Sequence, residues 1–189
     1  MRAGSLAQSR LWPLSLAAAF ERLLAQRATY LAATALVLGL AAGVRLFGVD
    51  RFGFNSDEAV YAGQAAALAG HQDYAQLFGV FRAHPLLVHF LVSLVYRITG
   101  VNDVAPRLVS VAFGVGMVGA GGAIANVIRG RAAGLLTMLF LALSAYPVMV
   151  SRQLLLDGPM AFFFSLTLLF LALYVQRHRA AFLHAARKK

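Results

Sequence analysis

Four long apolar runs dominate the sequence, and each is long enough to form a helix that crosses a lipid bilayer. The runs cover residues 30–48, 105–128, 132–150 and 159–176, close to the roughly 20 apolar residues that a spanning helix needs. Hydrophobic residues make up 60% of the chain and charged residues 13%, whereas soluble domains carry about 25% charged residues. The sequence therefore predicts an all-α integral membrane protein with about four transmembrane helices, and it argues against a soluble enzyme.

Basic residues lie mostly between these runs and at the two ends of the chain. Lys and Arg number 17 against 7 Asp and Glu, for a formal net charge of +10. A nucleic-acid-binding protein would gather such residues on a polar surface, so we expect no nucleic-acid partner. Because positive residues favour the cytosolic side of a membrane, we place residues 1–29, Arg129, Arg131 and the basic tail 177–189 in the cytosol.

Residues 85–99 are also apolar, and their placement decides the topology. A span of about 15 residues would be short, and it would move Arg129, Arg131 and the basic tail to the outside, against the positive-inside rule. We therefore expect residues 85–99 to form an interfacial helix. Loops 50–104 and 151–158 are then both extracytoplasmic, both termini are cytosolic, and the first loop carries one or two juxtamembrane helices.

Residues 11–20 form a shorter apolar run that follows Arg10. Ten residues are too few to span a bilayer. The run suits an amphipathic helix on the cytosolic membrane surface, and the alternative is the core of a signal peptide. We favour the surface helix because no clear small-x-small cleavage site precedes a polar stretch.

The strongest polar motif is residues 55–62, which read Asn-Ser-Asp-Glu-Ala-Val-Tyr-Ala. Its first two residues are suited to cap a helix over residues 57–69, which Gly70 would end. Asp57 is then a carboxylate at the membrane–water boundary, where it can act as a general base or bind a cation. The alternative is that Asp57 and Glu58 only complement the dipole of the helix.

A second motif, residues 151–159, reads Ser-Arg-Gln-Leu-Leu-Leu-Asp-Gly-Pro. Pro159 is suited to the first turn of the last span, because a helix start does not need its missing N–H group. The motif places Arg152 and Asp157 in a short loop at the same outer face as Asp57. An ordinary connecting loop is the alternative interpretation.

Basic residues also stand beside prolines at two helix starts. Residues 81–86 read Phe-Arg-Ala-His-Pro-Leu, and they place Arg82 and His84 at the mouth of an apolar helix, where they can bind phosphate. The alternative is a plain loop-to-helix boundary. Arg107 follows Pro106 at the outer end of the second span, where an anionic lipid headgroup is a sufficient partner.

Together these elements resemble the N-terminal part of the GT-C membrane glycosyltransferases, which use polyprenyl-phosphate sugars. The resemblance is to the aminoarabinose transferases of lipid A and to the protein O-mannosyltransferases. Each motif is weak alone, but their order and spacing are specific, and they make residues 30–176 a GT-C-like transmembrane module. The matching segments are Asp57-Glu58-Ala59-Val60-Tyr61-Ala62, His84-Pro85-Leu86, Ala105-Pro106-Arg107-Leu108-Val109-Ser110, and Ser151-Arg152 with Asp157-Gly158-Pro159.

The resemblance implies that a sugar moves, with inversion, from a polyprenyl-phosphate donor to an acceptor hydroxyl or phosphate at the outer face of a bacterial inner membrane. It assigns Asp57 the role of general base, and Asp157 that of a second carboxylate that orients the acceptor or tunes Asp57. The phosphate candidates are Arg82, His84 and Arg152, of which Arg82 is our own inference. The supporting residues are Glu58, Tyr61 and Arg107.

Some relatives place a divalent cation between such acids. Two carboxylates without a clear third ligand do not predict a metal site, so we expect no certain cofactor. The family often has a basic residue followed by Pro-Pro-Leu, whereas His84 is followed by a single proline, which weakens its assignment to a phosphate.

Family members usually have several hundred residues and more spans. We therefore expect an N-terminal module of a longer enzyme, or a chain that needs a second chain to supply further transmembrane helices. The alternative is a catalytically incomplete module that binds lipid or a partner subunit. A transporter ranks last, because Arg45 is the only charged residue within a span and lies near its end, where it can snorkel.

Overall fold

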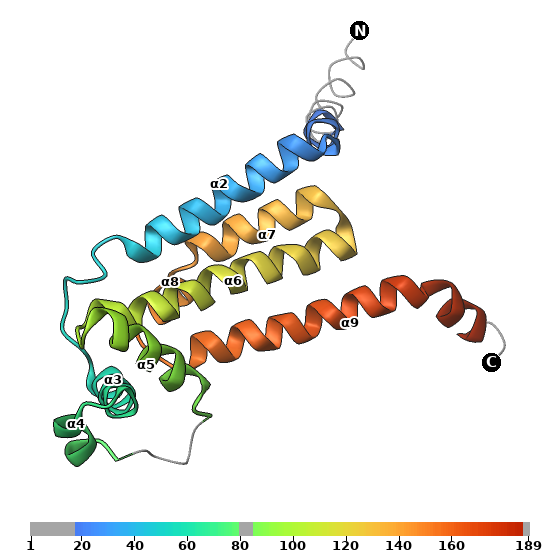
Figure 1. Ribbon diagram of the computed structural model, residues 1–189. Coiled ribbons are helices and arrows are strands. Elements are labelled where there is room, and N and C mark those ends of the chain that lie inside the picture. Colours follow the sequence, from blue (N-terminus) through green and yellow to red (C-terminus); the bar gives the residue numbers. More distant parts are fainter. Residues whose placement is uncertain (1–17, 80–84, 187–189) are drawn as a thin grey trace, which may run out of the picture.

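In the computed structural model, which describes residues 18–79 and 85–186, every regular element is a helix (Figure 1). Three helices are long and apolar enough to cross a membrane, and a bent pair can form a fourth span. The prediction of an all-α membrane protein with about four spans is confirmed. The spanning helices are α2 (Arg27–Leu46), α6 (Val104–Arg129), α9 (Asp157–Ala186, of which 157–178 qualify) and the pair α7 (Arg131–Leu143) with α8 (Ala145–Ser151).

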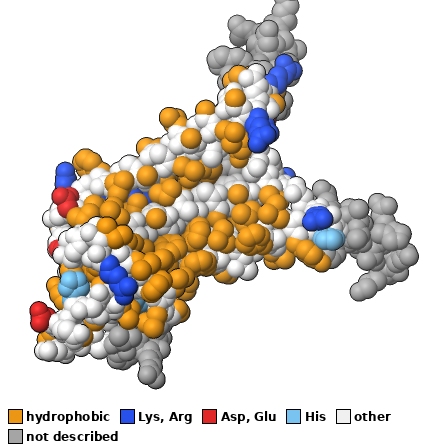
Figure 2. All heavy atoms as spheres, in the orientation of Figure 1, with side chains coloured by type: hydrophobic (Ala, Val, Ile, Leu, Met, Phe, Trp, Pro, Cys, Tyr) orange, Lys and Arg blue, Asp and Glu red, His pale blue; other side chains and the backbone are white. Residues whose placement is uncertain are grey.

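The spanning helices run antiparallel to their neighbours in sequence, so the connections gather at two ends (Figure 1). One end holds the start of α2, the end of α9 and the α6–α7 turn at Gly130, whose φ of 91° favours glycine. The other end holds the residues that follow α2 and those between α8 and α9. Hydrophobic side chains cover the flank between the ends, and most charged side chains lie near the ends (Figure 2).

Three shorter helices lie at the second end, which we call the loop end: α3 (Ser56–Ala69), α4 (Gln72–Leu77) and α5 (Leu87–Thr99). At 1.5 Å per residue α5 is about 20 Å long, well short of the ~30 Å hydrocarbon core. The length of α5 therefore agrees with the predicted non-spanning helix over residues 85–99. A core of Ala62, Ala65, Val88, Val92 and Tyr96 packs α3 against α5.

The predicted span over residues 132–150 is wrong in one respect, because it is broken at Ser144. α8 is bent by 63° from α7, and Ser144 has an extended backbone with ψ of 127°. Pro147 lies in the first turn of α8, where its missing N–H group costs nothing. A continuous helix through Pro147 would leave the Leu143 carbonyl without its partner, so the break falls just before this turn.

The last helix differs from its prediction at both ends. α9 begins at Asp157, so Asp157 lies in the first helical turn and not in a loop ahead of Pro159. The segment after residue 176, predicted as a basic tail, continues as helix to Ala186. At the other end of the chain residues 18–25 are helical, and most of the predicted surface helix lies outside the described residues.

Glycines allow α6 to pack closely against its neighbours. A Cβ atom on Gly116 would approach the ring of Phe162 in α9 to 2.6 Å, and one on Gly122 would clash with Met138 in α7. Small residues also recur every four positions on α6, where Gly116 and Ala120 are packed and Ala112 is exposed. α6 is therefore the central helix that fixes the positions of α7 and α9.

Candidate functional site

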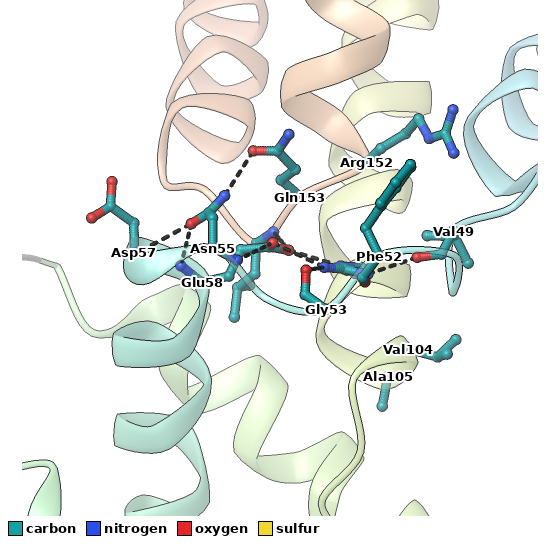
Figure 3. Close-up of polar contacts among 12 residues, drawn as sticks. Val49, Phe52, Gly53, Asn55, Asp57, Glu58, Val104, Ala105, Arg152 and Gln153 are labelled. Atoms are coloured by element: carbon teal, nitrogen blue, oxygen red, sulfur yellow. Dashed lines mark hydrogen bonds and ion pairs between the residues drawn. The ribbon is translucent and has the colours of Figure 1, made fainter.

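A buried ion pair joins α3 to α6 at the loop end (Figure 3). Glu58 lies in the first turn of α3 and Arg107 in the first turn of α6, and they are only 1% and 3% exposed. Arg107 Nε donates to Glu58 Oε1 at 2.8 Å, and Arg107 Nη2 donates to Glu58 Oε2 at 2.9 Å. Two parallel bonds of this kind form the strongest pairing of arginine with a carboxylate.

The remaining donors of Arg107 hold the loop that follows α2. Arg107 Nη1 donates to the carbonyls of Val49 and Phe52 at 2.8 and 2.7 Å, and Nη2 also donates to the Gly53 carbonyl at 3.0 Å. All five N–H groups of the guanidinium therefore have partners. Arg107 therefore does not need the alternative partner, an anionic lipid headgroup, because Glu58 and this loop accept all of its hydrogen bonds.

Glu58 also accepts two backbone hydrogen bonds, and these connect the two loops. The amides of Asn55 and Leu154 donate to its carboxylate at 3.2 and 2.9 Å, and the Asn55 side chain accepts from the Asp57 and Glu58 amides. Asn55 is thus the cap in the predicted position, and α3 ends at Gly70 as predicted. Burial alone would raise the pKa of Glu58, but the bonds from Arg107, Leu154 and Asn55 lower it below 4.5.

Side chains on the segment after α8 add a second bridge between the loops (Figure 3). The Asn55 side-chain amide donates to Gln153 Oε1 at 3.0 Å. Arg152 Nη2 donates to the carbonyls of Phe47 and Gly48 at 2.7 and 3.0 Å. The segment around Asp57 and the segment before Asp157 are therefore held together at one end of the bundle, as the topology predicted.

The two predicted acids both lie near Tyr61. Asp57 precedes Tyr61 by one turn of α3, and its exposed side chain points away from Glu58 (Figure 3). Asp157 and Tyr61 both line a cleft of about 440 Å³ between α3, α5 and α9. Burial raises the pKa of Tyr61, and the negative charges of Asp57 and Asp157 raise it further, so the phenol stays protonated.

Apolar side chains form most of this cleft, which we call the transfer cleft. They come from the start of α5 and from the first turns of α9, and Pro85 of the predicted His84-Pro85-Leu86 motif lies among them. His89 lies behind Tyr61, 2% exposed, with its ring edge-on to the phenol at 5.5 Å between centroids. The predicted sites do not include His89. The apolar lining residues are Pro85, Leu87, Val88, Leu156, Pro159, Met160 and Phe163.

Comparison with protein-family profiles matches residues 83–186, more than half of the chain, to the family described as dolichyl-phosphate-mannose-protein mannosyltransferase. The chain belongs to this family. It is a glycosyltransferase of the GT-C type, as the motifs predicted. No curated protein and no solved structure matches the chain.

The family match covers only part of the candidate site. Arg107, Arg152 and Asp157 lie inside the matched residues, and Asp57 and Glu58 lie before them. The hydrogen bonds of Glu58 to Arg107 and Leu154 connect the two parts. The first loop is therefore attached to the matched segment by direct contacts.

Arg45 was predicted to snorkel to the membrane surface, but it points into the helix bundle, where it is 0% exposed. Its Nε donates to Ser151 Oγ at 2.8 Å, and its Nη1 and Nη2 donate to the carbonyls of Ala41, Ala142 and Leu141 at 3.1 to 3.4 Å. The last turn of α7 leaves these last two carbonyls free for it, because the helix breaks at Ser144. The broken span therefore explains why a buried cation is tolerated here.

Arg82 and His84, two of the predicted phosphate ligands, lie outside the described residues and remain predictions. Over residues 18–79 and 85–186, no three His, Asp or Glu side chains come close enough to hold a metal ion. Arg152 lines a different cleft from Asp157. The structure thus brings Tyr61 and the two acids together, and it separates Arg152 from the transfer cleft.

Proposed function

We propose that this mannosyltransferase-family protein moves a sugar from a polyprenyl-phosphate donor to an acceptor in the transfer cleft, on the extracytoplasmic face. The observation that carries this proposal is that Asp157, in the first turn of α9, lines an apolar cleft together with Tyr61, and that Asp57 lies one turn before Tyr61 on α3. An apolar cleft with a few polar groups is the usual form of a ligand site. Apolar walls from α5 and α9 suit an isoprenoid chain, and Asp157 in the lining, with Asp57 one turn before Tyr61, suits the reacting sugar.

In this proposal Asp57 is the general base. It takes the proton from the acceptor hydroxyl while that oxygen attacks the anomeric carbon from the face opposite the phosphate. The bond from the anomeric carbon to the phosphate oxygen breaks, and the lipid phosphate leaves with the electron pair, which inverts the configuration. Since phosphate is a good leaving group, the protein has mainly to position the acceptor and remove its proton.

Asp157 and Tyr61 have positioning roles. Asp157 accepts a hydrogen bond from the acceptor, and the protonated Tyr61 donates one to a carboxylate or to the sugar. Arg82 and His84 remain the candidates for the donor phosphate, because they precede Pro85 in the sequence and Arg152 lines another cleft. Glu58 and Arg107 hold the loops and take no part in proton transfer.

The test uses membrane vesicles that contain the full chain, a radiolabelled mannosyl phosphoryl polyprenol and an acceptor. A general base contributes about 10²–10⁴-fold, so Asp57→Asn is expected to lower label transfer by at least about 100-fold. Asp73→Asn is the matched control, because Asp73 is an exposed acid in the first turn of α4, and it should keep the unaltered rate. Full transfer by Asp57→Asn would exclude the base role.

An apolar groove supports the second candidate, an incomplete module that binds lipid or a partner subunit. The groove, about 520 Å³, lies between the second half of α6 and the middle of α9, where the two helices separate (Figure 1). Side chains such as Ile128, Leu171 and Val175 line it and are exposed. A helix of a second chain fits such a groove. Transfer by the purified chain without any partner would exclude this alternative.

A further inference from the structure

A second cleft at the loop end shares no lining residue with the transfer cleft. It has a volume of about 550 Å³ and lies between the loop after α2 and the short helix α8. Its walls are largely apolar, with Val49 and Phe52 on the loop and Val148 and Met149 on α8. The proposed transfer reaction does not use this cleft, so any ligand of the cleft must be a different molecule from the reacting sugar and acceptor.

The charge of this second cleft comes from Arg152. Three charged residues line it, and two of them, Glu58 and Arg107, neutralise each other. Arg152 forms no ion pair with a described residue, and both of its hydrogen bonds come from Nη2. Its Nη1 and Nε therefore have no partner among the described residues, which leaves a half-buried cation with open donors. Such a group suits an anion.

Arg152 also lines a separate groove along the last two turns of α2. Its other lining residues are Leu40, Gly43, Val44 and Phe47, so the groove is apolar and lies along a spanning helix. The same guanidinium therefore lies where an apolar groove of the spanning region meets a cleft of the loop end. A ligand that fills both must have an apolar chain and an anionic head.

We propose that Arg152 binds the phosphate headgroup of an anionic membrane phospholipid, whose chain lies in the α2 groove. A free phosphate ion would use the cation but not the groove. The sugar donor would have to reach the transfer cleft, which shares no lining residue with either cavity. The site is therefore a lipid site additional to the proposed transfer reaction, and its test is independent of transfer.

The experiment measures lipid association with the full chain in phosphatidylcholine vesicles, using spin-labelled phosphatidylglycerol and spin-labelled phosphatidylcholine. Arg152 should raise the preference for phosphatidylglycerol about fivefold, the ratio that one basic residue contributes near an anionic surface. Arg152→Gln should therefore lower the preference of the unaltered chain by that factor. Arg97→Gln is the matched control, because Arg97 is an exposed arginine at the same end that also donates to a backbone carbonyl, that of Leu68, and the preference should stay.

A second pair of variants tests the groove without touching Arg152. A Cβ atom on Gly43, or on Gly39 one turn earlier, would meet nothing within 4 Å. Both glycines are exposed, so a leucine side chain at either position can extend away from the bundle core. Gly43→Leu fills the groove and should weaken the association of both lipids severalfold, whereas Gly39→Leu should not, because Gly39 does not line it.

Four results would overturn the proposal. The first is a preference for phosphatidylglycerol that Arg152→Gln leaves unchanged, and the second is an equal loss from Gly43→Leu and Gly39→Leu. The third is full displacement of the lipid by millimolar inorganic phosphate, and the fourth is displacement by polyprenyl phosphate as effective as that by phosphatidylglycerol. The third result would assign the site to a free anion, and the fourth would assign it to the sugar donor.

Discussion

Arg107 donates two parallel hydrogen bonds to the Glu58 carboxylate although 49 residues separate them in the sequence. The pair joins the helix that carries Asp57 to the central spanning helix. Through the carbonyls of Val49 and Phe52 and the amide of Leu154 it also fixes both loops of the site. The position of the two acids therefore depends on a residue pair that takes no part in the proposed chemistry.

Loss of one partner of this pair should destabilise the loop end strongly. Arg107→Gln leaves Glu58 as a buried, uncompensated charge, which costs about 3–5 kcal/mol. The free energy of unfolding can be measured by titration with sodium dodecyl sulfate in mixed micelles. Arg97→Gln, at an exposed arginine, should change it by less than about 0.5 kcal/mol. Equal stability of the two variants would show that the pair contributes nothing.

The ionised state of Glu58 predicts how stability changes with pH. Its pKa in the folded protein is below the ordinary value of 4.5, so its contribution to the free energy of unfolding is complete at pH values above 4.5. The contribution is lost as the pH falls through the lower, folded pKa, because the proton then binds the unfolded chain more readily. Glu58→Gln should be less stable at neutral pH and should lack this acid-side loss. An identical acid-side loss in Glu58→Gln would assign it to another group.

The close approach of α6 to α8 predicts the effect of a single methyl group. A Cβ atom on Gly114 would clash with Ser151 and lie 3.1 Å from Arg45 Nε. Gly114→Ala should therefore lower the free energy of unfolding by about 1–3 kcal/mol, as overpacking does. Gly39→Ala is the control and should be neutral or stabilising by up to about 1 kcal/mol, because its Cβ atom meets nothing. Equal stability of these variants would mean that α8 does not pack here.

The sequence was sufficient to predict the spanning helices, apart from the break before α8, and to predict which loops share one end of the bundle. The apolar runs gave the spans, the basic residues at Arg129 and Arg131 indicated which ends lie together, and Asn55 and Gly70 gave the limits of α3. The spans and the limits of α3 are local features, since each depends on one continuous stretch of the sequence. The structure confirms that the segments of Asp57 and Asp157 share one end of the bundle.

The contacts between distant segments could not be predicted in the same way. Nothing near Arg107 in the sequence names Glu58 as its partner, and nothing near Arg45 indicates a bond to Ser151. Arg45 became buried because the break at Ser144 opens the carbonyls of α7. Pro147 inside an apolar run was the one local signal of that break. His89 behind Tyr61 likewise follows from the packing of α5 on α3.

The central claim is that Asp57 and Asp157 serve one reaction in one cleft, and a double-variant cycle in the transfer assay tests it most directly. Groups that act as a unit give losses that do not multiply. We predict that Asp57→Asn combined with Asp157→Asn transfers label no more slowly than Asp57→Asn alone, within about threefold. Losses that multiply in the double variant would contradict the account, because the two acids would then act independently.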